Sequence, residues 1–229
     1  MHLGDVNYTL SFWLGKKFPG YTLSKGELEK LLHLSQMKHF NKLIGLTEEY
    51  KPGQPMPSVF FEENIRITTD IQQFKSEKDL MINNAGYAKL PDDYYYPSAL
   101  TIKLINGDKI KYRNVRIVSD KEFAEKVGSS ARLPNKYFPI GNILGGKIRF
   151  APPDFRYSHF VYLKTPERPV YGLKYDRGFA EYVPSESTEL NWDDANLINI
   201  MVIALAEIGV SVASADLINI TNQEKVTGQ

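Results

Sequence analysis

The sequence predicts an α+β fold: N-terminal helices, a small and mostly antiparallel sheet with long loops, a packed C-terminal helix and an extended tail. Three observations support this. Apolar residues recur at three-to-four spacing in residues 28–43, a period of two replaces this spacing in residues 80–118, and helical spacing returns in residues 191–209. Because helices and strands are grouped along the chain, an alternating parallel-sheet fold is disfavoured.

A capping box opens the first clear helix. Ser24 and Glu27 have the spacing at which the serine oxygen accepts a bond from one free amide and the glutamate returns to the serine amide. Gly45 then supplies a left-handed stop. We expect one face of this helix on a core: Leu28, Leu31, Leu32, Ser35, His39 and Leu43. Residues 6–18 indicate a shorter helix that ends at a Pro-Gly turn.

The middle of the chain begins with a connector. Residues 51–57 contain three prolines, which remove amide donors and fix φ, so we expect an extended segment. A short helix is possible around residues 64–74. Alternating patterns then predict three strands, at residues 80–90, 96–104 and 109–118. Asn106, Gly107 and Asp108 between the last two are typical of a β-hairpin turn.

The second half of the sheet region is predicted in the same way. Ser119 and Glu122 form another capping box, which should start a helix of one or two turns ending near Gly128. Residues 147–150 and 158–164 are predicted to be strands. In the latter, apolar residues occupy both faces, as expected of a strand covered on both sides.

Two long segments rich in proline, glycine and tyrosine are predicted to be functional loops, at residues 132–146 and 165–178. Tyrosine combines an apolar ring with a polar tip and is favoured in contacts between subunits. We therefore expect these loops to contact a neighbouring subunit. The candidate interface residues in them are Tyr137, Phe138, Ile143, Leu144, Tyr171 and Tyr175.

The strongest helical pattern starts at Asn191 and ends at Gly209. Asp193 and Asp194 lie in its first turn, where they complement the helix dipole. Its expected core face comprises Trp192, Ala195, Ile198, Met201, Val202, Leu205 and Ile208.

The tail at residues 210–229 has too few apolar residues to bury on its own. Around Leu217, Ile218 and Ile220 it alternates well enough to add a strand to another chain. We take these three residues as further interface candidates. A tail that folds back on its own domain is the alternative.

Length and composition favour one globular domain over residues 1–229. The chain is 42% hydrophobic and 24% charged, close to the average for globular proteins. We expect three parts in this domain: a helical N-terminal part with its connector at 1–57, a core of sheet and terminal helix at 58–209, and a C-terminal arm at 210–229.

Charge and hydropathy disfavour several partners. The formal net charge is +1, so no overall field would attract phosphate backbones or anionic membranes, and sequence-independent binding of nucleic acid is disfavoured. We also expect no sequence-specific nucleic-acid partner. The chain contains no cysteine, which suits a reducing cytoplasm. The N-terminus lacks a signal-peptide pattern, and the longest apolar run, residues 200–206, is too short to span a bilayer. No membrane partner is therefore expected.

No pattern in the sequence predicts catalysis. The four histidines lack the spacing of metal ligands, and the glycine-rich residues 141–146 match no phosphate-binding loop, so a hairpin turn is favoured there. Asp92 and Asp93 are adjacent and are better explained as a turn than as paired catalytic carboxylates. We expect no catalytic, cofactor-binding or metal-binding residue, no cofactor, and no enzyme.

Several short segments follow one another in an order that resembles the head-to-tail connector proteins of tailed phages. They are Leu-Pro-Asp-Asp-Tyr-Tyr at 90–95, Ala-Pro-Pro at 151–153, Phe-Val-Tyr-Leu-Lys-Thr-Pro at 160–166, and the closing apolar helix. The N-terminal pieces at 24–27 and 53–57 are similar to ring proteins of crAss-like phages of Bacteroidetes. The likeness lies in the order of the segments and covers most of the chain.

This resemblance implies a non-catalytic virion protein made in the bacterial cytoplasm. It implies a closed ring of twelve copies at the head-tail junction, below the portal and around the channel through which DNA leaves. The implied partners are copies of the chain itself, the portal protein and other neck or tail rings. A ring subunit needs no catalytic group and benefits from aromatic loops and an arm.

Two other classes of function stay open from the sequence. Tyrosine-rich loops at residues 92–97 or 169–182 would suit a receptor- or carbohydrate-binding module of a phage tail. A small-molecule enzyme is the remaining alternative, but no nucleophile, base or cofactor loop supports it.

Overall fold

The computed structural model of the chain describes residues 1–45, 69–106, 109–129, 133–176 and 179–209. They form an α+β fold, as predicted. The chain divides into two compact units: a helical unit of Met1–Gln73 and Pro166–Gln229, and a sheet unit of Phe74–Thr165. The sheet unit therefore interrupts the helical unit in sequence.

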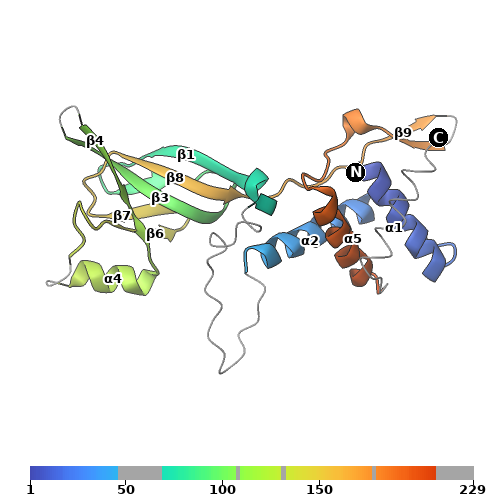
Figure 1. Ribbon diagram of the computed structural model, residues 1–229, viewed down its shortest axis with the longest axis horizontal. Helices are drawn as coiled ribbons and strands as arrows, with labels where there is room; N and C mark the ends of the chain where they lie inside the picture. The colour runs from blue at the N-terminus through green and yellow to red at the C-terminus, as the bar shows by residue number, and fades with distance from the viewer. Residues whose placement is uncertain (46–68, 107–108, 130–132, 177–178, 210–229) are drawn as a thin grey trace, which may run out of the picture. The chain divides into compact units, whose positions relative to one another are not determined.

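In its described part, the helical unit is built from three α-helices: α1 (Leu3–Lys17), α2 (Lys25–Leu43) and α5 (Asp194–Glu207). Helix α5 packs against both α2 and α1 (Figure 1). Half of the buried apolar side chains in and beside these helices are leucine, and Phe40 packs against Trp192 near the start of α5. The buried set is Leu3, Val6, Leu10, Leu14, Leu28, Leu32, Phe40, Ile44, Trp192, Leu197, Ile200, Met201, Ala204 and Leu205.

The helix caps agree with the sequence patterns. The Ser24 hydroxyl accepts a bond from the Glu27 amide, and the Ser24 amide donates to the Glu27 carboxylate at 2.9 Å. Gly45 has φ of +75°, which confirms the left-handed stop. Helix α5 begins later than predicted, because Asp193 is its cap and accepts a bond from the Asn196 amide at 2.7 Å.

The predicted core face of α5 is only partly right. Met201 and Leu205 are buried, but Ala195 is exposed and Ile198 is half-buried. The face that the helix buries is rotated toward residues the pattern did not select: Asn196, Leu197, Ile200 and Ala204. The helix is apolar on most sides, so its periodicity could not single out the buried face.

Residues 166–190 follow the sheet unit in sequence and belong to the helical unit. Strands β9 (Leu173–Asp176) and β10 (Phe179–Tyr182) form a hairpin where a loop was predicted, and the short helix η3 (Pro184–Glu186) follows. The rings of Tyr171 and Tyr182 stack with centroids 4.8 Å apart. This segment is therefore ordered within its own unit.

The sheet unit contains two four-stranded sheets with one shared core (Figure 1). One sheet has the order β1-β8-β3-β4, and the other β2-β7-β6-β5. The bounds of the strands in the first sheet are β1 (Lys75–Met81), β8 (Tyr157–Lys164), β3 (Tyr94–Asn106) and β4 (Lys109–Asn114). In the second they are β2 (Tyr87–Lys89), β7 (Lys147–Ala151), β6 (Ile140–Leu144) and β5 (Arg116–Ile117).

The core between the sheets is apolar and draws on both. It comprises Leu80, Ile82, Ala88, Leu90, Leu100, Ile102, Val115, Ile148, Phe150, Phe155, Phe160 and Tyr162. Helix α4 (Asp120–Gly128) starts at the predicted cap, where Ser119 accepts a bond from the Glu122 amide at 3.3 Å. Its Phe123 packs with Val118, Ile140 and Ala151 in a smaller cluster.

Two strand predictions and one loop prediction need correction. Residues 80–90 are the end of β1, a turn and β2, since Gly86 adopts φ of +79° between them. The pattern at residues 109–118 breaks at Val115, which turns the chain from β4 into β5 of the other sheet. Residues 132–146 are not one long loop, because they include β6. The predicted hairpin between β3 and β4 is confirmed, although residues 107–108 lie outside the described part.

The domain organisation also differs from the expected one. The terminal helix was expected to share a core with the sheet, but α5 packs with the N-terminal helices instead. The connector at residues 51–57 and the arm at 210–229 lie outside the described residues.

Candidate functional site

Two of the most exposed aromatic residues in the described part of the chain lie in one ordered turn before β6. The Asn135 carboxamide oxygen accepts bonds from the amides of Tyr137 at 2.8 Å and Phe138 at 3.1 Å. The Asn135 carbonyl also accepts a bond from the Phe138 amide. These bonds fix the turn, yet Tyr137 is 67% exposed and Phe138 77% exposed. We call residues 133–138 the aromatic turn.

The other predicted interface residues are not gathered around this turn. Leu144 is exposed at the β6–β7 hairpin, whereas Ile143 packs partly against the core. Tyr175 is exposed but belongs to β9 of the helical unit.

Tyr171 is only 7% exposed. Its hydroxyl accepts a bond from the Asn7 side chain at 3.1 Å, and its amide donates to Glu29 at 3.0 Å, so it stabilises its own unit. Leu217, Ile218 and Ile220 lie outside the described residues.

A groove beside the aromatic turn is rich in cationic side chains. It is lined by the β3–β4 hairpin, by two residues of the turn and by the segment that leads into β8: Lys103, Leu104, Lys111, Arg113, Lys136, Tyr137, Asp154, Phe155, Arg156 and Tyr157. Five of these residues carry a positive charge. We call this feature the basic groove.

Little in the groove neutralises these charges. Asp154 supplies the only carboxylate among the described residues that line it. None of the five cations lies within 4.0 Å of a carboxylate in the described part of the chain. The Arg113 guanidinium lies 5.8 Å from the centre of the Tyr137 ring, a cation–π distance that joins strand β4 to the aromatic turn.

Charge is also divided between the two units. The sheet unit contains 16 lysines and arginines against 9 aspartates and glutamates, a formal net charge of +7. The rest of the chain contains 12 against 18, a formal net charge of −6. The overall charge of +1 therefore results from two units whose opposite charges nearly cancel.

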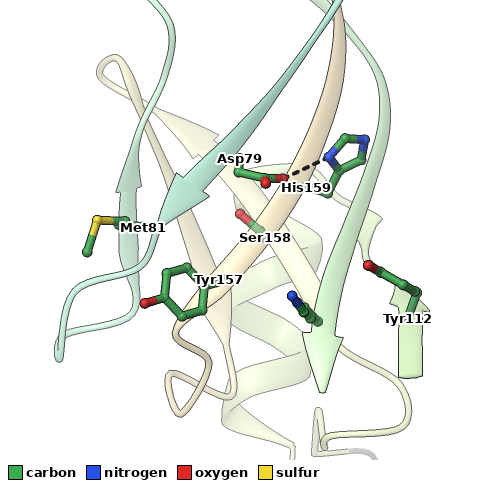
Figure 2. Close-up of a pocket in the computed structure, with 7 residues that line it drawn as sticks. Asp79, Met81, Tyr112, Tyr157, Ser158 and His159 are labelled. Carbon is green, nitrogen blue, oxygen red and sulfur yellow. Dashed lines mark hydrogen bonds and ion pairs between the residues drawn. The ribbon is translucent and has the colours of Figure 1, made fainter. Parts of the chain in front are cut away.

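A second, neighbouring hollow lies on the outer face of the β1-β8-β3-β4 sheet. It is lined by Asp79, Met81, Lys103, Tyr112, Tyr157, Ser158 and His159. Figure 2 shows the Asp79 carboxylate directed at the His159 ring, with Nδ1 and Oδ1 2.9 Å apart. Glu77 lies 3.5 Å from the other ring nitrogen.

The histidine and carboxylate of this hollow do not complete a hydrolytic triad. Ser158 is adjacent to His159, but its register partners, Leu80 and Ile102, are buried core residues. Neighbouring residues of a strand point to opposite faces, so the Ser158 hydroxyl lies on the core side and cannot be activated by His159. The hollow holds a surface cluster of polar and charged side chains.

The glycines at residues 141–146 belong to a hairpin, as the sequence favoured. Gly145 and Gly146 have φ of +57° and +75° at the turn between β6 and β7. Gly141 is packed so closely that a Cβ atom would approach Leu100 and Val115 to 3.2 Å. Packing explains this glycine without a phosphate ligand.

Within the described ranges, no group of three or more acidic or histidine side chains could hold a metal ion. The helices described there are all too short or too polar to cross a membrane.

The cations of the basic groove were missed by reasoning from the sequence. They are spread over residues 103–156, and only the tertiary structure brings them together. A charge count over a sliding window would have found the basic middle of the chain.

No family model matches the chain, and no curated protein matches it.

Proposed function

We propose that this protein is a non-catalytic structural subunit of a ring at the head-to-tail junction of a tailed phage. In this proposal about twelve copies close around the DNA exit channel below the portal, as the resemblance in segment order implies. The observation that carries the proposal is the aromatic turn, in which a fixed backbone holds Tyr137 and Phe138 out from the sheet unit.

A fixed turn with exposed aromatic rings suits a contact between subunits. Large apolar rings are costly to leave in water, and the bonds to Asn135 have already ordered the backbone that carries them. A partner surface can cover Phe138 without ordering a loop. Leu133, which is 57% exposed in the same turn, adds to the apolar surface that a neighbour would bury.

Among the described tyrosines that suggested the carbohydrate-binding alternative, only Tyr175 is largely exposed. Tyr94 is half-buried against Phe160, and burial raises the pKa of its hydroxyl to about 12. Tyr171 and Tyr182 stack on each other rather than offering open faces to a sugar. We therefore do not carry this alternative forward.

Replacing Phe138 with serine tests the assembly. The wild-type chain is expected to form a large closed ring on concentration, and F138S is expected to stay monomeric with an unchanged circular dichroism spectrum, because the exposed ring contributes nothing to the core. Mass photometry and sedimentation velocity measure this. Met81→Ser removes another exposed apolar side chain of the sheet unit and should assemble normally. A wild-type chain that stays monomeric at all concentrations would refute self-assembly.

The tail residues Leu217, Ile218 and Ile220 are part of the same proposal on their sequence pattern alone. Their alternation would allow a strand to be added to the edge of a portal or neighbouring ring.

A further inference from the structure

We infer that the basic groove binds the phosphodiester backbone of nucleic acid without reading its base sequence. The groove belongs to a single chain, so the inference adds to the proposed function without requiring a ring. The overall charge of +1 led us to expect no attraction to phosphate backbones, but the sheet unit alone has a formal net charge of +7.

The positive charges of the basic groove are spread along it. Lys111 and Arg113 alternate along the edge strand β4, while Lys136 and Arg156 come from separate loops, so the cations are distributed along the groove. Lys111, Arg113, Lys136 and Arg156 are exposed, and none is held in an ion pair with a described carboxylate. Unpaired cations at spaced positions match the repeating phosphates of a nucleic-acid strand.

Aromatic rings among the cations favour nucleic acid over an acidic polypeptide as the ligand. Tyr137 and Tyr157 place partly exposed rings among the cations. Base faces and sugars stack on such rings, and interleaved cations and aromatics are typical of sequence-independent nucleic-acid surfaces. An acidic peptide would use the charges but would gain little from the rings.

The chemistry of the groove favours contacts with the phosphate backbone over contacts with the bases. The described groove residues offer amine and guanidinium donors, which suit phosphate oxygens. The groove is an open depression and presents no helix that could enter a major groove. Contacts to the backbone alone explain this composition.

The test compares two variants that remove the same charge from the same unit. Lys111→Ala with Lys136→Ala changes the groove, and Lys78→Ala with Lys147→Ala changes exposed lysines elsewhere in the sheet unit. Fluorescence anisotropy with labelled oligonucleotides of mixed sequence, single-stranded and duplex, measures binding of the full chain at a concentration where it is monomeric. Unlabelled polyglutamate serves as the competing acidic polypeptide.

The groove variant should bind either form of oligonucleotide on the order of tenfold more weakly than the wild type. The slope of log affinity against log salt should fall by about 0.7 per lost contact for single strands, or about 0.9 for duplex. The control variant should bind like the wild type, and permuting the oligonucleotide sequence should change nothing.

Equal weakening in both variants would mean that only the net charge matters and would overturn the site. Equal competition by polyglutamate would overturn the assignment to nucleic acid. Neither result depends on assembly, which F138S measures separately.

Discussion

At the scale of single residues, a buried polar network links α2 to α5 and to the returning chain. His39 Nε2 lies 2.7 Å from Asn196 Oδ1, so this ring nitrogen donates the bond. The Gln36 side chain donates to the Glu167 carbonyl at 2.7 Å, and the Trp192 indole donates to Gln36 at 3.4 Å. These three side chains are therefore all hydrogen-bonded, and each bond fixes one segment relative to the next.

The network makes stability depend on pH through His39. Burial lowers the pKa of His39 from its ordinary value of 6.5, and Lys42 acts in the same direction. The bond that His39 donates to Asn196 and the carboxylates of Asp70 and Asp193 oppose this shift. The folded state thus keeps the ring neutral, whereas the unfolded state accepts a proton near pH 6.5.

The neutral state of buried His39 makes the folded protein less stable at low pH. Because the folded pKa is depressed, the unfolded state binds more protons as the pH falls below about 6.5, so stability is lost in that window. We expect the thermal midpoint of the wild type to fall between pH 7.5 and pH 5.5, values chosen about one unit either side of the unfolded pKa. His39→Gln should reduce this dependence.

His33 provides the comparison. Burial also lowers its pKa, but it is less enclosed, so His33→Gln should remove a smaller part of the dependence on pH. Differential scanning fluorimetry across the range measures all three proteins. A His39 variant with the full wild-type dependence would contradict this account.

At the scale of elements, α5 is the central helix of the helical unit. Leu205 has no exposed surface and lies on the side of α5 that packs against the other helices. Leu205→Ala should lower the free energy of unfolding by about 2 to 5 kcal/mol, because the deletion leaves a cavity that the neighbours only partly fill.

Denaturant unfolding measures this loss. Ile208→Ala, at the partly exposed end of the same helix, should cost much less. An unchanged midpoint for Leu205→Ala would show that α5 is peripheral.

At the scale of the whole molecule, the sheet unit is inserted in the helical unit through two points that lie together. Strand β1 opens the unit and β8 closes it, and Lys75 is the register partner of Leu163 in this antiparallel pair. The two crossings of the chain are therefore adjacent within the sheet unit. Closely spaced ends allow a unit to be inserted in another, or removed, with little disturbance.

We expect the fragment Phe74–Thr165 to fold alone. It has its own core between two sheets, and its ends need no partner to be held together. Circular dichroism and dispersed amide resonances should show strands, and urea should unfold the fragment in one cooperative step. A fragment without dispersed resonances would show that the helical unit is needed to fold the sheets.

The sequence by itself determined the features that depend on neighbours along the chain. The capping serines Ser24 and Ser119, the stop at Gly45 and the β3–β4 hairpin all follow from interactions within a few residues. The α+β class follows from the order of these elements.

Only the tertiary structure decided which distant segments share a core. It placed α5 with the N-terminal helices and buried Tyr171. It also decided that the chain passes from one sheet to the other at Val115. It also gathered Lys111, Lys136 and other cations into one groove. Such contacts depend on shape and burial between segments far apart in sequence, and a periodic pattern carries no information about the partner it will meet.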